Sequence, residues 1–125
     1  MRSVRRAKVY ARRRARRLAA KTQDLTAGQW ADLVAAWGGC AYCGATGTSV
    51  QKDCVLPIAH GGRYTVTNVV PACPTCNASK GDAEVTAWLR HKRLDETRFL
   101  TRFLVIRAQF AADGTADRPV GTQAP

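Results

Sequence analysis

The sequence predicts a small α+β domain in which helices flank a cysteine-rich centre. Two Cys-x-x-Cys pairs, Cys40/Cys43 and Cys73/Cys76, bracket a stretch that contains two candidate strands. Apolar residues recur at helical spacing before and after that stretch. The chain has 125 residues, enough for one domain with tails, and a domain of about 60–70 residues within it is marginal without a stabilising metal ion or cross-link.

The segment before the first cysteine pair is predicted to form two helices. Residues 4–21 are rich in Arg and Ala without a helix breaker, but their apolar stripe is thin, so this helix is weakly stable alone. Thr26 and Gln29 have the spacing of a capping box. A short amphipathic helix follows, with these residues on its apolar face and at its end: Trp30, Leu33, Val34, Trp37 and Gly38-Gly39.

The rest of the chain is predicted to contain two strands and three helices. Residues 50–56 and 66–70 are the strands, and a polar loop with two glycines joins them. The second cysteine pair opens a helix that runs through Lys80. Two further helices are expected, one capped by Asp82 and one by Asp95. The last residues, 111–125, lack a periodic pattern and are predicted to be a disordered tail.

The four paired cysteines point to one structural zinc ion. Zinc takes four thiolates in tetrahedral geometry, and a site filled by four sulfurs leaves no position for water or substrate. The alternatives that the spacing leaves open are two disulfides, an iron–sulfur cluster or a redox-active pair. No apolar leader precedes the first helix, so we expect a reducing, cytoplasmic location, which favours a metal over disulfides.

The positive charge of the chain is concentrated at its N-terminus. The net charge is +11, and residues 1–21 hold ten of the twenty Lys and Arg and no acid. Such an arm attracts a polyanion, and nucleic acid is the expected partner. A solvated tail, a localisation signal and a transit peptide are the alternatives. No apolar run approaches about 18 residues, so no membrane span is expected. The candidate nucleic-acid contacts in the arm are Arg5, Arg6, Arg12, Arg13, Arg14, Arg16 and Arg17.

Residues 40–82 resemble the zinc-bearing members of the HNH endonuclease family. The resemblance is carried by Asp53-Cys54-Val55-Leu56-Pro57-Ile58-Ala59-His60-Gly61-Gly62, by Thr67-Asn68-Val69-Val70-Pro71-Ala72-Cys73, and by Cys76-Asn77-Ala78-Ser79-Lys80-Gly81-Asp82. It implies the ββα-metal fold, also called the His-Me finger. It also implies that Asp53 and Asn77 bind a catalytic Mg²⁺ or Mn²⁺ and that Asn68 orients the general base. Arg63 and Lys80 flank this site as candidate phosphate contacts.

The chain departs from the family at the position of the catalytic histidine, where it has Cys54. Three interpretations stay open at this point. Cys54 is an unusual base, activated by a nearby cation; or His60, six residues later, has taken over; or the site is weakened and kept for binding. An engineered replacement of histidine by cysteine is a further possibility that one sequence leaves open.

These features predict three regions: a basic helical arm that binds nucleic acid (1–25), an HNH-like zinc-containing nuclease domain (26–110) and the tail (111–125). The predicted function is a metal-dependent endonuclease that hydrolyses phosphodiester bonds, with DNA favoured as substrate. The alternative is a catalytically degenerate nucleic-acid-binding protein with the same fold. A third hypothesis is a purely structural zinc module whose arm binds RNA.

Overall fold

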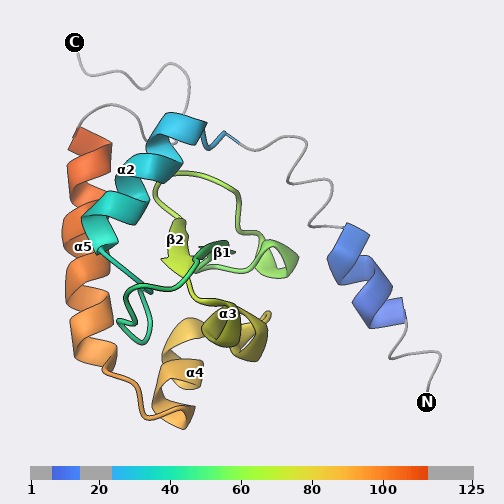
Figure 1. The fold of residues 1–125 in the computed structure, drawn as a ribbon. Helices are drawn as coiled ribbons and strands as arrows, with labels where there is room; N and C mark the ends of the chain where they lie inside the picture. The colour runs from blue at the N-terminus through green and yellow to red at the C-terminus, as the bar shows by residue number, and fades with distance from the viewer. Residues whose placement is uncertain (1–6, 15–23, 113–125) are drawn as a thin grey trace.

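The computed structural model describes residues 7–14 and 24–112, and its elements have the order expected for a strand–strand–helix unit with flanking helices (Figure 1). Residues 7–14 form a helical segment. The elements that follow are α2 (Ala27–Trp37), β1 (Gln51–Cys54), the 3₁₀ turn η1 (Ile58–His60), β2 (Val69–Ala72), α3 (Pro74–Lys80), α4 (Val85–His91) and α5 (Glu96–Ala112). The α+β fold class predicted from the sequence is confirmed.

Strands β1 and β2 form a two-stranded antiparallel sheet in which Asp53 pairs with Val70 and Cys54 with Val69. Both strands are shorter than predicted, and the second is shifted towards the C-terminus. The first strand ends early because the Leu56 amide bonds the side chain of Asn68 instead of a partner strand. The second strand tolerates Pro71 because it has β1 on one side only.

An aromatic cluster around Phe99 of α5 joins the helices to the segment that carries the first cysteine pair. The Phe99 ring is fully buried and lies 5.8 Å from Trp37 of α2 and 5.1 Å from Tyr42. Tyr42 also meets Trp88 of α4 edge to face at 5.1 Å. Trp37 is thus a core residue, as predicted, whereas Trp30 is only partly buried, with the Lys52 ammonium 5.7 Å from its ring centroid.

The helix ends agree with the sequence predictions except at α4. Thr26 and Gln29 form the predicted capping box, and the carboxylate of Asp95 accepts a bond from the Arg98 amide at the start of α5. The predicted cap of α4 by Asp82 is wrong. Glu84 caps that helix instead, because its carboxylate accepts bonds from the Thr86 and Ala87 amides.

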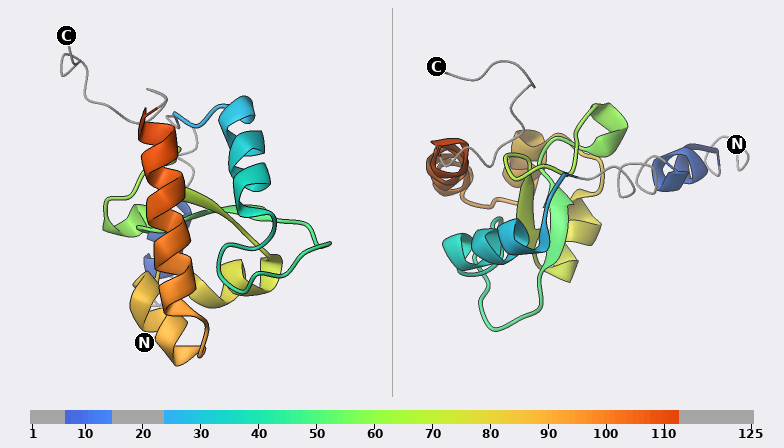
Figure 2. Two further views of the ribbon diagram at one scale, coloured as in Figure 1. Left: turned by 90° about the vertical axis from the view of Figure 1, so that its left-hand side faces the viewer. Right: turned by 90° about the horizontal axis from the view of Figure 1, so that it is seen from above.

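The arm segment and α5 lie on opposite sides of the sheet, with α2 beside α5 (Figures 1 and 2). The arm was predicted to be helical over 4–21, and residues 7–14 confirm the part of it that the structure describes. The remaining arm positions and most of the predicted tail lie outside the described residues, while α5 extends to Ala112. Within residues 7–14 and 24–112, every helix is too short or too polar to cross a membrane.

Replacing Phe99 by alanine should lower the free energy of unfolding by about 3–5 kcal/mol, because it empties the centre of the aromatic cluster. Thermal or urea unfolding of the purified protein measures this change. Leu104→Ala on the same helix is the matched control, because its side chain is 63% exposed and its loss should cost under about 0.5 kcal/mol. Equal effects of the two substitutions would contradict this description of the core.

Candidate functional site

The four paired cysteines lie together as one candidate metal centre. Their Sγ atoms all fall within 4.8 Å of one another, and the Sγ atoms of Cys43 and Cys73 are 3.9 Å apart. Four sulfurs around zinc at about 2.3 Å have neighbours roughly 3.8 Å apart, which matches this spacing. None of the five cysteines forms a disulfide. The donor type and spacing therefore fit a tetrahedral ion with four thiolates.

Each cysteine pair is held by backbone amides that donate to its first sulfur. The Cys43 amide donates to Cys40 Sγ at 3.5 Å, and the Cys76 amide donates to Cys73 Sγ at 3.4 Å, at the N-terminus of α3. Burial opposes ionisation of Cys40, but amide bonds from Cys43, Cys73 and Tyr42 outweigh it and lower the pKa of Cys40 to about 7. Burial instead raises the pKa of Cys43 and of Cys76 above the usual thiol value. Because metals bind thiolates, an ion held by this cluster would have to displace protons from these cysteines.

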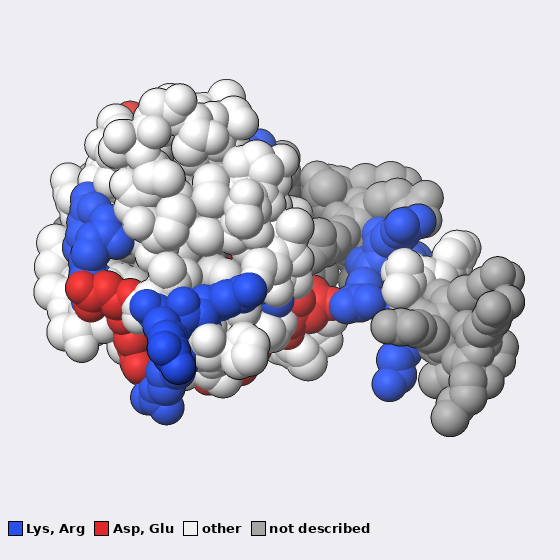
Figure 3. Space-filling view, turned by 60° about the horizontal axis from the view of Figure 1, so that its bottom comes forward, with Lys and Arg blue, Asp and Glu red and all other residues white. Residues whose placement is uncertain are grey.

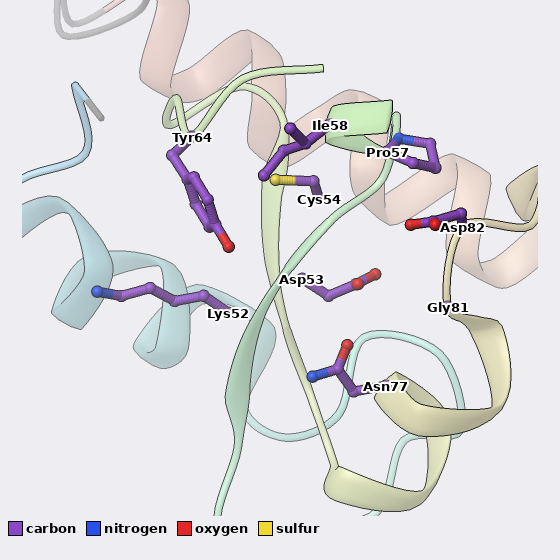
Figure 4. Close-up of a pocket in the computed structure, with 9 residues that line it drawn as sticks. All are labelled: Lys52, Asp53, Cys54, Pro57, Ile58, Tyr64, Asn77, Gly81 and Asp82. Carbon is purple, nitrogen blue, oxygen red and sulfur yellow. The ribbon is translucent and has the colours of Figure 1, made fainter. Parts of the chain in front are cut away.

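A small cavity lies where β1 ends, between η1 and the loop that follows α3 (Figure 4). The space in which the centre of a water molecule fits is about 20 Å³. This space suffices for one water molecule or ion. Asp53 of β1, Asn77 of α3 and Asp82 of the following loop point into it from three elements (Figure 4). Oxygen donors of this kind suit Mg²⁺ or Mn²⁺, so the residues present fit a divalent ion.

Asp53 is a buried carboxylate with two strong partners. Its side chain is 6% exposed, and Oδ2 accepts a hydrogen bond from the Tyr42 hydroxyl at 2.5 Å. The Lys80 ammonium lies 3.2 Å from the same oxygen. Burial, followed by the Asp53 charge, raises the pKa of Tyr42 well above its usual value, so the tyrosine stays protonated and keeps donating. The orientation of Asp53 is therefore held from two sides.

Lys80 is placed differently from the sequence prediction. It was predicted to contact phosphate at the surface, but its side chain is 0% exposed. Its Nζ donates to the Cys54 carbonyl oxygen at 3.0 Å and pairs with Asp53 inside the protein. In this structure the ammonium is directed at these two oxygens and away from solvent, so it offers no surface charge to a phosphate.

Asn77 and Asn68, the two predicted asparagines, have different surroundings. The Asn77 side chain donates to Gln51 Oε1 at 2.7 Å, which leaves its amide oxygen on the cavity side (Figure 4). Asn68 ties the loop together: it accepts from the Leu56 amide at 2.8 Å and donates to the carbonyl oxygens of Leu56 and Arg63, at 3.0 and 2.9 Å. Asn68 thus acts on the loop backbone, and Asn77 faces the ion-sized cavity.

Gly62 allows the loop to close on Asn68. A Cβ atom at this position would stand 1.8 Å from the Leu56 carbonyl oxygen and 3.0 Å from Asn68 Nδ2. Any side chain would therefore push these two segments apart. The double glycine in the sequence marks this close approach.

Cys54 and His60, the two candidate bases, lie apart. Cys54 is 7% exposed and lines the cavity, and its thiol donates to the Arg63 carbonyl oxygen at 3.8 Å. Asn68 donates to that same oxygen, so it positions Cys54 through a shared acceptor. His60 is exposed and lines a separate apolar hollow beside Leu56 and Val85. The fold brings Cys54, and not His60, to the cavity that holds Asp53.

One basic residue of the arm, Arg12, contacts the rim of this cavity. Arg12, Arg13 and Arg14 are exposed, and Arg12 Nε is 3.3 Å from Asp82 Oδ2. Figure 3 shows blue side chains of the arm segment next to acidic atoms of the body. Arg63 is also exposed, where it pairs with Asp24 at 2.7 Å. The other predicted contacts of the arm, Arg5, Arg6, Arg16 and Arg17, lie outside the described residues.

The sequence prediction missed Asp82, which lines the cavity, and Tyr42, whose hydroxyl donates to Asp53. The sequence predicted a helix cap at Asp82, because aspartate is common at that position. The sequence signal that Asp82 lies at the cavity is the preceding Gly81. Gly81 ends α3 with a φ of 51°, a conformation that favours glycine, and the chain changes direction there before Asp82. Tyr42 carries no signal beyond its place inside the first cysteine pair.

A family model described as HNH endonuclease matches residues 40–93, which include both cysteine pairs, the hairpin, α3 and α4. No curated protein and no solved structure matches the chain.

Elemental analysis of the purified protein should find one zinc ion per chain, and Cys73→Ser should lose most of it. Because a structural zinc contributes about 10–16 kcal/mol in small domains, chelation should also unfold the domain, as followed by circular dichroism. Cys54→Ser is the matched control and should keep its zinc, because Cys54 lies outside the four-cysteine cluster. A wild-type protein that holds no zinc and resists chelators would contradict this assignment.

Proposed function

We propose that the chain is a metal-dependent endonuclease, starting from the match of residues 40–93 to the HNH endonuclease family model. It hydrolyses phosphodiester bonds in nucleic acid, with DNA as the favoured substrate. One observation carries the proposal: Asp53, Asn77 and Asp82 converge on a cavity of ionic size at the end of β1. Cys54 lines the same cavity, where the family has its base.

The proposal gives two metal ions separate roles, one in catalysis and one in the structure. Asp53 and Asn77 hold a Mg²⁺ or Mn²⁺ ion, which stabilises the charge that grows on the phosphate during cleavage. The zinc ion of the four-cysteine cluster plays no chemical part, because its four positions are filled by sulfur.

Cys54 is proposed as a poor base, whose sulfur points towards Ile58 and Tyr64 rather than towards Asp53 (Figure 4). A cysteine thiol ordinarily has a pKa near 8.5, and this one donates a hydrogen bond to the Arg63 carbonyl oxygen. Only a small thiolate fraction can then accept the proton of an attacking water molecule. We infer a slow enzyme.

The contacts of Cys54 and Asp53 also favour a second candidate function. A cysteine at the base position whose thiol is engaged with the Arg63 carbonyl oxygen, and an Asp53 already paired with Lys80, are features of a site kept for binding. The second candidate is therefore a nucleic-acid-binding protein that retains the fold without cleavage.

The basic arm is proposed to supply affinity without reading sequence. Arginine contacts to phosphate position a protein on nucleic acid and carry little sequence information. The contact between Arg12 and Asp82 supports a place for the arm at the rim of the cavity. A strand bound by the arm would then run close to Asp53.

Incubating the protein with supercoiled plasmid and Mg²⁺ or Mn²⁺ should produce slow nicking that Asp53→Asn abolishes. Cys54→His should raise the nicking rate by about 10²–10⁴-fold, because imidazole is the better base at neutral pH. His60→Ala is the control and should leave the rate unchanged. Nicking only by Cys54→His would support the binding protein, and nicking that survives Asp53→Asn would refute the proposed site.

Replacing Arg12, Arg13 and Arg14 together by alanine should weaken DNA binding most strongly at low salt. The slope of log affinity against log salt should fall by roughly 0.9 for each phosphate that the arm no longer neutralises. Fluorescence anisotropy with a labelled duplex measures both quantities. Arg107→Ala, an exposed position on α5 across the molecule from the arm, should change neither. An equal drop in affinity for the two variants would mean that net charge alone, and not the arm, provides the affinity.

A further inference from the structure

Lys80 places a positive charge inside the site that the divalent ion is proposed to occupy. Its Nζ is 3.2 Å from Asp53 Oδ2 and 3.0 Å from the Cys54 carbonyl oxygen, and it lies 6.0 Å from the centre of the Tyr42 ring. The side chain of Lys80 is 0% exposed and that of Asp53 is 6% exposed. Water therefore screens this pair poorly.

The local structure explains why the two charges meet. Lys80 follows Asn77 by one turn of α3, so the two side chains lie on the same face of the helix. That face packs on β1, where Asn77 contacts Gln51 and Lys80 contacts Asp53. A single short helix thus brings both a candidate metal ligand and a cation to the same carboxylate.

A buried ammonium and a divalent ion compete for the same negative charge. Burying Asp53 requires a compensating partner, and Lys80 already provides it. A divalent ion that binds Asp53 comes to lie within a few ångströms of Lys80, in a region where charges interact more strongly than in water. Asp53 therefore cannot attract the ion with a full, uncompensated charge.

We propose that Lys80 is a positioning residue and the resident counter-ion of Asp53, so that the divalent ion binds weakly to the free protein and firmly only together with a nucleic-acid phosphate. The phosphate supplies the negative charge that Lys80 has cancelled. This inference rests on the proposed function, since it concerns the same ion. It makes substrate binding and metal binding cooperative.

Electron paramagnetic resonance of Mn²⁺ added to the zinc-loaded, full-length protein without nucleic acid tests the inference. Wild type should bind Mn²⁺ weakly. Lys80→Met, which removes the charge, should bind it at least about tenfold more tightly, whereas Lys80→Arg, which keeps the charge, should resemble wild type. Binding by Lys80→Met that is no tighter than that of wild type overturns the role of Lys80.

A second measurement avoids the risk that Lys80→Met fails to fold, because it uses wild type. Mn²⁺ is titrated with and without a random-sequence DNA duplex, and Asp53→Asn is titrated in parallel to subtract the ions that DNA binds by itself. The component that depends on Asp53 should tighten at least about tenfold with the duplex. An unchanged affinity overturns the cooperative binding.

These outcomes separate this inference from the proposed function, because neither measurement depends on cleavage. If Asp53→Asn leaves Mn²⁺ binding unchanged under every condition, no divalent site exists at Asp53, and both proposals fail. If Asp53-dependent binding is present but insensitive to Lys80 and to DNA, the endonuclease proposal stands and only the counter-ion role is refuted.

Discussion

The four-cysteine cluster is the constraint on which the rest of the structure depends. It joins the turn before β1 to the N-terminus of α3, two segments that 29 residues (44–72) separate in the sequence. The intervening hairpin has only two strands of four residues each, too little for independent stability. Because the cluster fixes both ends of this unit, the hairpin and α3 are held against each other.

Tyr42 links this cluster to the cavity. It lies between the two cysteines of the first pair, its ring packs in the aromatic cluster around Phe99, and its hydroxyl donates to Asp53. The position of the candidate catalytic carboxylate thus depends on the same turn that holds two of the sulfurs. A shift of this turn would therefore disturb Asp53, even though the four-cysteine cluster and the cavity are separate sites. Stability and chemistry are coupled through this one residue.

Local features of the fold were predictable because their causes are local. The capping box at Thr26 and Gln29, the stop at Gly38 and the start of α3 at Cys73 all depend on residues within a few positions of each other. The strand limits were less accurate, because Asn68 takes the Leu56 amide out of the ladder through a contact between distant residues. Asp82 was misassigned for a related reason, since capping and cavity-lining aspartates look alike in a sequence.

The sequence by itself determined the α+β class and the four-cysteine cluster, because residue type and spacing carry that information, and its resemblance to the HNH family singled out Asp53, Asn68 and Asn77 as candidates. Only the tertiary structure decided that Lys80 is buried against Asp53, that His60 lies outside the cavity and that Asp82 lines it. The physical reason is that exposure and charge pairing arise where α3, β1 and the loops meet. No short stretch of sequence contains all of the residues that come together there.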